Sequence, residues 1–435
     1  MILTQKRKSV IKHPHRNKNF KDCTFAVMKQ FNVPIIYRSP LIAAVKTKRR
    51  QQDKMKKDFT PTLLDFGPVQ IYLARHFGFC YGVENAIDIA FRTIDENPGK
   101  QIFLLSEMIH NPQVNADLVQ RGVRFLQDTN GEQIVSFEAL SKDDVVIIPA
   151  FGTTLEIEKT LNSIGIPIAK YNTTCPFVEK VWNRSEQIAT KNYTVVVHGK
   201  PTHEETRATF SHAASNTPTI VVNDMAETIA LSKYITREKP SADFYTEFKG
   251  RYSEEFDVEK HLDRIGVVNQ TTMLASDTQA ISDFLKQVMM EKYGLTEATI
   301  EERFADTRDT LCYATNDNQT AVYGLLKTPA DIAIVVGGYN SSNTSHLVEL
   351  CEEKLPTYFI SSEEKIISSA EILHYDFHTK KENITADFLP ASKPVKILLT
   401  SGASCPDALV EGVIAKLVSF FQVPYNMQTI TEQFA

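Results

Sequence analysis

The chain has 435 residues, which is long enough for two or three domains of ordinary size. Hydrophobic residues make up 42% of the chain and charged residues 23%, the usual composition of a soluble globular protein with a large core. No apolar run approaches the ~18 residues that a membrane-spanning helix needs, so the sequence predicts no membrane partner.

Six cysteines are spread thinly along this chain, at positions Cys23, Cys80, Cys175, Cys312, Cys351 and Cys405. Small secreted domains that depend on disulfides carry cysteines far more densely. Because the sequence also shows no secretory signal, it predicts a reducing compartment. We expect a cytoplasmic bacterial protein rather than a plastid one.

The net charge of -5 hides a strongly basic head. Residues 1–60 contain 16 Lys and Arg against 3 Asp and Glu, so the head carries +13 and the rest of the chain -18. A transit peptide would be richer in serine, and nucleic-acid binding would normally add aromatic residues or a reading motif. We therefore favour a solvated extension over both alternatives, and the acidic body predicts no nucleic-acid partner.

The first chemically informative stretch is "FGFCYGVENAIDIAF", in which Cys80 lies between Gly78 and Gly82. A strand is predicted over 71–74, followed by a glycine turn and by apolar residues at helical spacing. The Cys80 thiol is thus expected at a helix N-terminus, where unpaired N–H groups and the helix dipole favour a thiolate. Taken alone, Cys80 could equally be a small buried apolar residue.

The same order of strand, polar loop and helix recurs along most of the chain. "VVIIPAFGTTLEIEKTL", "IPIAKYNTTCPFVEKVW" and "DIAIVVGGYNSSNTSHLVELC" are three examples. This alternation predicts an α/β fold of three small domains, each with a parallel sheet flanked by helices, arranged around a central site. The expected ranges are a basic N-terminal extension over 1–67 and domains over 68–165, 166–275 (with a charged insertion at 237–264) and 276–435.

The loops expected at the carboxyl ends of the strands carry the residues suited to chemistry, which is where open parallel sheets bind ligands. Cys80, Cys175 and Cys312 lie far apart in sequence, each on a polar turn before a helix. Zinc sites more often use close pairs of cysteines, whereas a 4Fe-4S cluster held by only three thiolates leaves one iron open to substrate. Cys351 lies on an apolar helix face and is expected in the core, and Cys405 is a weaker candidate ligand.

Several other loops are suited to anions. Ser341, Ser342 and Asn343 follow a glycine pair at a helix start, and His110 and Ser404 stand in similar settings. Helix capping alone would explain each loop, but together they indicate a ligand of diphosphate size.

A second polar loop, "HGKPTHEET", places a carboxyl and an imidazole close enough to pass a proton, at Glu205 and His203. Solvation at the surface is the alternative for this pair. By strand-like alternation, Glu204 is expected to point away from Glu205.

Eight ordered stretches, from "GFCYGV" through "IHNPQV", "TTCPFVEKV", "THEET", "NQTTML", "LCYAT" and "NSSNTSHL" to "SGASCPD", resemble the motifs of 4-hydroxy-3-methylbut-2-enyl diphosphate reductases. The resemblance runs from about Pro68 to Phe421 and is closest to the long branch of plants and cyanobacteria. It implies an oxidoreductase at the last step of the methylerythritol phosphate route, which forms isopentenyl and dimethylallyl diphosphates.

Carried over by position, the resemblance implies that Cys80, Cys175 and Cys312 hold one 4Fe-4S cluster. Glu205 would supply the proton on which the hydroxyl leaves as water. The residues expected to bind the substrate, mostly at its diphosphate, are His110, His203, Thr271, Ser341, Ser342, Asn343 and Ser404. A low-potential donor, ferredoxin or flavodoxin, would deliver the electrons.

One position departs from the shorter members of the family. A second diphosphate-binding histidine is replaced by Phe151, so its contact is missing or comes from Thr153 or Thr154. A non-catalytic iron-sulfur sensor for a phosphorylated metabolite remains the alternative function. A sensor would have no use for the proton donor Glu205.

Overall fold

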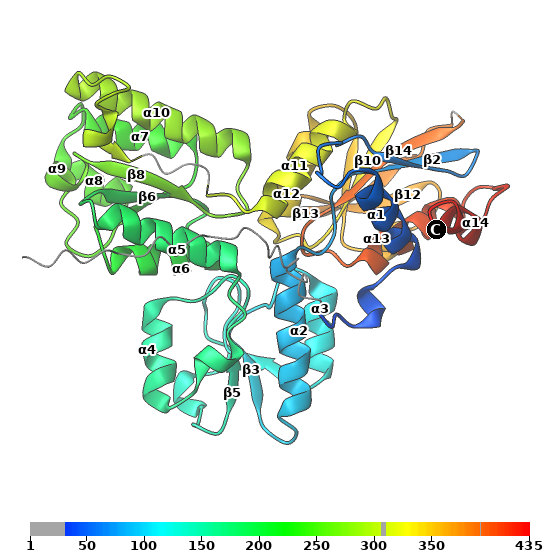
Figure 1. Ribbon diagram of the computed structural model, residues 1–435, viewed down its shortest axis with the longest axis horizontal. Coiled ribbons are helices and arrows are strands. Elements are labelled where there is room, and N and C mark those ends of the chain that lie inside the picture. Colours follow the sequence, from blue (N-terminus) through cyan, green and yellow to red (C-terminus); the bar gives the residue numbers. More distant parts are fainter. Residues whose placement is uncertain (1–30, 306–309, 392) are drawn as a thin grey trace, which may run out of the picture. The chain divides into compact units, whose positions relative to one another are not determined.

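The computed structural model describes residues 31–305, 310–391 and 393–435. In this part of the chain, helices flank three larger β-sheets, and a two-stranded sheet is the fourth (Figure 1). The α/β class predicted from the sequence, with parallel sheets covered by helices, is confirmed. Residues 32–435 form one compact unit. Among the described residues, no helix is both long and apolar enough to cross a membrane.

The largest sheet has five strands in the order β1-β2-β14-β10-β11. Only β1 and β2 run antiparallel to one another, and the other neighbours are parallel. Its strands are β1 (Thr62–Asp65), β2 (Val69–Leu73), β14 (Val395–Ser401), β10 (Ile332–Val336) and β11 (Thr357–Ile360). Runs such as "IAIVV" in β10 are buried on both faces, as expected for strands that helices cover on both sides. The helices of this part are α1 (Pro40–Gln52), α11 (Tyr313–Leu325), α12 (Ser342–Glu352), α13 (Asp407–Val418) and α14 (Met427–Glu432).

The described end of the basic head belongs to the core of this sheet. Helix α1 contacts α13 and α14, and its residues Leu41, Ile42 and Val45 are buried in the same cluster as β14. The short 3-10 helix η1 (Ile35–Tyr37) precedes it. Residues 32–66 therefore do not form the solvated extension expected for 1–67. Residues 1–30 lie outside the described part.

A second sheet contains three parallel strands in the order β4-β3-β5. The strands are β3 (Ile102–Leu104), β4 (Val123–Phe125) and β5 (Val145–Ile147). Figure 1 shows α2 and α4 beside them. The helices of this part are α2 (Tyr81–Glu96), α3 (Pro112–Gln120) and α4 (Leu155–Ile164), with the 3-10 turns η2 (Phe137–Ala139) and η3 (Ile168–Tyr171).

The third sheet has four parallel strands in the order β7-β6-β8-β9. The strands are β6 (Thr194–His198), β7 (Thr219–Val222), β8 (Ile265–Asn269) and β9 (Phe304–Ala305). The helices of this part are α5 (Pro176–Ala189), α6 (Glu204–Ala214), α7 (Met225–Ile235), α8 (Ser241–Glu247), α9 (Val258–His261) and α10 (Ala275–Tyr293), with the 3-10 turn η4 (Ile300–Glu302).

The charged stretch 237–264 is anchored in this third part by its aromatic residues. Phe244, Phe248 and Phe256 are almost fully buried in the core cluster of β7 and β8. The rings of Phe244 and Phe256 stack with their centroids 5.4 Å apart. The stretch is therefore a folded part of the sheet's cover, anchored by its buried aromatic residues.

Sheet membership crosses the domain boundaries expected from the sequence. Strand β2 lies in the range 68–165, yet it pairs with β14 near the other end of the chain. The antiparallel hairpin of β12 (Glu371–Asp376) and β13 (Lys381–Ala386) follows the 3-10 turn η5 (Glu363–Lys365). The three ranges remain a proposal as folding units, whereas the sheets themselves draw on distant segments.

Candidate active site

One cavity is lined by residues from loops and helix starts that follow strands of the three larger sheets. All eleven residues singled out from the sequence line it: Cys80, His110, Cys175, His203, Glu205, Thr271, Cys312, Ser341, Ser342, Asn343 and Ser404. Their positions in sequence span more than 320 residues, so the fold, and no local motif, brings them together. Their individual roles remain predictions.

Each of the three predicted ligand cysteines is the N-cap of a helix. Cys80 precedes α2, Cys175 precedes α5 and Cys312 precedes α11. The Sγ of Cys312 accepts a hydrogen bond from the backbone N–H of Thr315 at 3.3 Å. Three positive helix ends thus converge where thiolates would carry negative charge.

The sulfurs of Cys80 and Cys175 both lie close to Gly82. A Cβ placed on Gly82 would lie 2.5 Å from the Sγ of Cys175 and 4.0 Å from the Sγ of Cys80. Any side chain at Gly82 would therefore enter the space between the thiols. Glycine keeps this space open.

Burial makes these thiols poor acids. It raises the pKa of Cys80 to about 12 and that of Cys175 to about 11, and it also raises the pKa of Cys312. The neighbouring thiols add to the shift at Cys80 and Cys175. Three such thiols in one place need a cationic partner before they can exist as thiolates, and a metal centre supplies one.

Glu205 is a buried carboxyl on the cavity wall, 1% exposed. The backbone N–H of Thr271 donates to its Oε1 at 2.5 Å, and the Thr271 hydroxyl lies 3.0 Å from its Oε2. Burial raises the pKa of Glu205 to about 7 against the opposing effect of these hydrogen bonds. The carboxyl can therefore hold a proton near neutral pH and release it, as a general acid must.

His203 caps helix α6 with its ring. Its Nδ1 accepts a hydrogen bond from the backbone N–H of Glu205 at 3.1 Å, which leaves the proton of the neutral ring on Nε2. Burial lowers the pKa of His203 well below 6.5. His203 is therefore a neutral donor next to the carboxyl. The alternative of a solvated His203 and Glu205 pair is wrong, since both side chains are buried.

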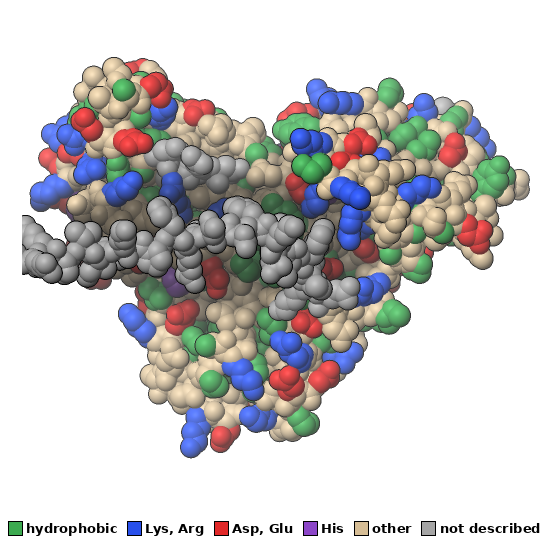
Figure 2. All heavy atoms as spheres, viewed as in Figure 1, with side chains coloured by type: hydrophobic (Ala, Val, Ile, Leu, Met, Phe, Trp, Pro, Cys, Tyr) green, Lys and Arg blue, Asp and Glu red, His purple; other side chains and the backbone are tan. Residues whose placement is uncertain are grey.

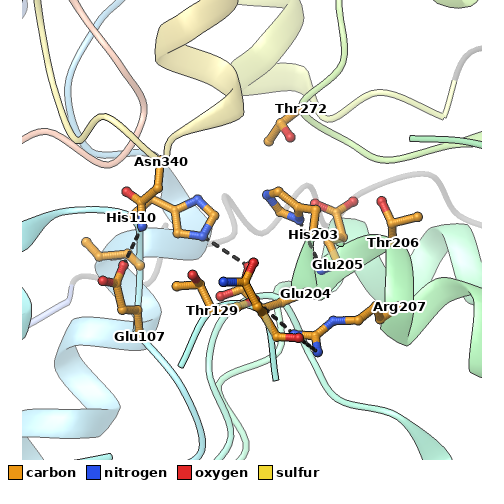
Figure 3. A network of polar contacts seen from close by, with 12 residues as sticks. Glu107, His110, Thr129, His203, Glu204, Glu205, Thr206, Arg207, Thr272 and Asn340 are labelled. Atoms are coloured by element: carbon orange, nitrogen blue, oxygen red, sulfur yellow. Dashed lines mark hydrogen bonds and ion pairs between the residues drawn. The ribbon is translucent and has the colours of Figure 1, made fainter. Parts of the chain in front are cut away.

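Glu204 points away from Glu205, as expected, but it does so from a helix and not from an extended strand, and its side chain is buried. It lies in the first turn of α6, is 6% exposed, and its Oε2 is 3.2 Å from Nε2 of His110 (Figure 3). Strand-like alternation does not apply here because His203 ends the extended loop, so that Glu204 and Glu205 are both helical. They leave the helix in different directions, Glu204 toward His110 and Glu205 toward Thr271.

The start of helix α12 presents polar donors to the cavity. Ser341 caps the helix, and its Oγ accepts from the backbone N–H of Thr344 at 3.3 Å. Ser342 Oγ and Asn343 Nδ2 are buried and make no hydrogen bond within the described residues. Buried polar groups are normally paired, so these two orphan donors need an acceptor, and an anion in the cavity supplies one.

Comparison with known proteins bears on these features. A family model described as "LytB protein" matches residues 71–418. A 4-hydroxy-3-methylbut-2-enyl diphosphate reductase of a Picosynechococcus species is 42% identical over 352 residues, covering 81% of this chain and 84% of the relative. One of Microcystis aeruginosa is 41% identical, covering 82% and 86%. The chain belongs to the LytB family.

A solved structure extends the agreement to the fold. The structure of E-1-hydroxy-2-methyl-but-2-enyl-4-diphosphate reductase from Plasmodium falciparum matches with a TM-score of 0.58 and 21% identity. The match covers 83% of this chain and 98% of the other. It supports the three-sheet arrangement of a LytB fold.

Phe151 lines the cavity of this LytB protein and contacts two imidazoles. Its ring stacks on His110 with centroids 4.3 Å apart and meets His203 edge-on at 5.5 Å. Neither Thr153 nor Thr154 is among the described residues that line the cavity, and Thr154 instead caps α4. Phe151 therefore presents a flat apolar ring to the cavity and packs against His110.

The remaining cysteines lie outside the cavity wall or outside the described residues. Cys351 is fully buried in the core, as predicted. Cys405 is also fully buried and is not among the lining residues. Cys23 lies outside the described residues.

The sequence did not reveal a set of polar contacts between separate parts of the cavity rim. Asn340 donates to Glu107 at 2.8 Å, and Arg207 donates to the carbonyls of Thr129 and Asn130 at 3.0 and 2.6 Å (Figure 3). Each pair joins residues at least 77 positions apart. The only sequence signal was the place of Asn340 next to the predicted anion loop.

Proposed function

We propose that this protein is the iron-sulfur reductive dehydroxylase that converts 4-hydroxy-3-methylbut-2-enyl diphosphate to isopentenyl and dimethylallyl diphosphates. The observation that carries the proposal is the meeting of Cys80, Cys175, Cys312 and Glu205 in one cavity. Relatives that share about 40% of its residues over four fifths of the chain carry the name of this reductase.

The cysteine set fits one iron-sulfur cluster. The three thiols lie at three helix N-termini and line one cavity, and Gly82 keeps the space beside Cys80 and Cys175 free. The buried thiols need a cation to ionise. When bound there, a 4Fe-4S cluster would supply electrons one at a time and one iron that no cysteine holds. Cluster type and ligand number are part of the proposal.

The polar rim would hold the diphosphate end of the substrate. Ser342 and Asn343 contribute the orphan donors, and α12 directs its N-terminus to the same place. His110, held by Glu204, and the neutral Nε2–H of His203 would add further donors. Ser341 and Ser404 are also predicted to contact the diphosphate. In the structure the Ser341 hydroxyl contacts Thr344, and the Ser404 hydroxyl donates to the carbonyl of His110.

Glu205 would donate the proton that the departing hydroxyl needs. The overall change breaks one C–O bond, consumes two electrons and two protons, and forms one C–H bond and one water. Thr271 contacts both carboxyl oxygens of Glu205, so the orientation of the carboxyl group is fixed. Enclosure of the carboxyl keeps it protonated at a pH at which an exposed glutamate is ionised.

The sensor alternative is not favoured. An anion cradle and three thiols would serve a sensor, but a buried carboxyl with its pKa near neutrality serves proton transfer. The electrons would come from a low-potential carrier, ferredoxin or flavodoxin. The cyanobacterial relatives fit a bacterial cytoplasmic protein, which we also propose.

Anaerobic purification followed by two measurements tests the function. We expect about four irons and four sulfides per chain, and turnover of the hydroxylated diphosphate with dithionite-reduced methyl viologen. A protein that holds the full cluster and binds the substrate without turning it over would instead establish the sensor.

A further inference from the structure

A second cavity lies at the opposite end of the third sheet from the candidate active site. The residues directly before the four parallel strands of that sheet all line it: Tyr193, Pro218, Arg264 and Arg303. His203 and Thr271, which line the active-site cavity, instead follow β6 and β8. Each of these two strands has five residues, so about 17 Å of strand separates the two cavities.

Strand pairing makes the two arginines of this second cavity neighbours. Ile265 pairs with Phe304 in the register of β8 and β9, and the backbone N–H of Ile265 donates to the carbonyl of Arg303 at 2.9 Å. Adjacent strands lie about 4.8 Å apart, so Arg264 and Arg303 stand beside one another at the edge of the sheet. Because both side chains line the cavity, two positive charges share it.

Neither arginine has an anionic partner among the described residues. The Cζ of Arg264 lies 4.5 Å from the centroid of the Tyr193 ring, and the Cζ of Arg303 lies 4.5 Å from that of Tyr293. The Nε of Arg264 is buried and makes no hydrogen bond. Stacking on a ring restrains a guanidinium plane and leaves its N–H groups for another acceptor.

The other charged groups of the cavity wall are already paired. Asp263 accepts hydrogen bonds from Lys292, at 3.2 Å, and from the Tyr293 hydroxyl. The Nζ of Lys260 lies 2.7 Å from a carboxylate oxygen of Asp257. Two uncompensated positive charges therefore remain in this cavity, in a protein whose net charge is -5.

His261 adds a neutral donor to the same wall. Its Nδ1 accepts from the backbone N–H of Asp257 at 2.9 Å, so the neutral ring carries its proton on Nε2. Burial lowers the pKa of His261 below 6.5, which keeps the ring uncharged at neutral pH. Figure 2 shows several Lys and Arg side chains over this end of the third part, where Figure 1 labels α8 and α9.

We propose that this second cavity binds a small phosphorylated anion through Arg264, Arg303 and His261. A guanidinium group matches two phosphate oxygens at once, and two such groups lie side by side here. A phosphate group carries about two negative charges at neutral pH, which balance both arginines, whereas a carboxylate balances only one. The inference goes beyond the proposed function and does not depend on it. It also gives a role to the charged stretch 237–264, which supplies Arg264 and His261.

The test measures binding to the holoenzyme by calorimetry and locates it by hydrogen exchange with mass spectrometry. The probes are inorganic phosphate, glycerol 3-phosphate and, as the carboxylate control, acetate. The test variant is Arg264→Gln with Arg303→Gln. The matched control is Arg92→Gln with Arg124→Gln, which removes two exposed arginines from α2 and β4.

We expect both phosphate probes to slow exchange in the peptides that contain Arg264 and Arg303, with no such effect of acetate. The affinity for phosphate at this site should fall at least tenfold in the test variant and stay within twofold of the parent in the control. Arg264→Lys with Arg303→Lys keeps both charges but loses the paired N–H groups, so it should bind phosphate more weakly than the parent. This second variant decides the question if the glutamine variant does not fold.

Parental phosphate affinity in the glutamine and lysine variants would overturn the site. Protection confined to the peptides of the active-site cavity, or equal binding of acetate, would overturn it as well. An equal loss in the control variant would show that the effect follows net charge and not position. The tighter of the two phosphate probes identifies the source of the ligand as free phosphate or a phosphate ester. Because no measurement uses turnover, the result is independent of the reductase function.

Discussion

Replacing Glu205 by glutamine separates acidity from shape at the cavity wall. A glutamine amide can still accept from the Thr271 N–H and donate to the Thr271 hydroxyl, the two contacts that Glu205 makes at 2.5 and 3.0 Å. The variant loses only the transferable proton. Since general acid catalysis contributes roughly 10²- to 10⁴-fold, the barrier should rise by about 3 to 5 kcal/mol.

The pH profile gives this prediction a second, sharper form. Burial raises the pKa of Glu205 to about 7, so the acid form is about half populated at neutral pH. Because the protonated carboxyl is the active species, kcat should fall about tenfold per pH unit above this pKa and level off below it. The alkaline decline should disappear in Glu205→Gln.

The assay is steady-state turnover with viologen, combined with substrate titration followed by the cluster spectrum. Binding of the substrate should survive in Glu205→Gln while kcat falls. Near-parental kcat, or an alkaline decline that persists in the variant, would refute the reasoning and assign the proton to water or to the substrate's diphosphate.

Three further predictions use the same assays. Serine in place of any one of the three cysteines that cap α2, α5 and α11 should abolish the cluster and turnover. The controls Cys351→Ala and Cys405→Ala should keep both. Full iron content in any of the three serine variants would exclude that cysteine as a ligand. Glu204→Gln should raise the KM about 10- to 100-fold with little change in kcat, because Glu204 holds the buried imidazole of His110. A hydrogen bond of this kind to a charged partner contributes about 1.5 to 3 kcal/mol. An effect on kcat alone would contradict the role of Glu204 in positioning His110. Deletion of residues 1–27 should leave turnover unchanged. Deletion of 1–60 should prevent folding because it removes the buried face of α1, and thermal unfolding measures this effect. A stable protein of residues 61–435 would contradict the packing of α1 in the core.

Most of the cavity residues could be predicted because they stand in local patterns with a clear physical meaning, whereas Thr271 was implied only by the resemblance to the family. A strand, a polar turn and a helix start can be read within about 15 residues, as around Cys80 and Ser341. Parallel sheets then direct such turns to one edge. The sequence thus identified candidate residues for the cavity without any knowledge of which sheets adjoin it.

Long-range pairing and the direction of single side chains could not be predicted in this way. Strand β2 pairs with β14 more than 320 residues later, and no local pattern in either strand indicates its partner. The positive charge of α1 likewise concealed its buried stripe of Leu41, Ile42 and Val45. A helix can carry many lysines and still contribute one face to a core.

Glu204 and Glu205 show how much function depends on one local transition. Had the loop stayed extended, alternation would have sent one carboxyl to the cavity and the other to solvent. Because His203 caps α6 with its ring, both carboxyls enter the first helical turn and both are buried. One then fixes the imidazole of His110 and the other keeps its proton near neutral pH. The same cap that satisfies a backbone N–H therefore assigns two adjacent glutamates to different tasks, positioning at one wall and acidity at the other.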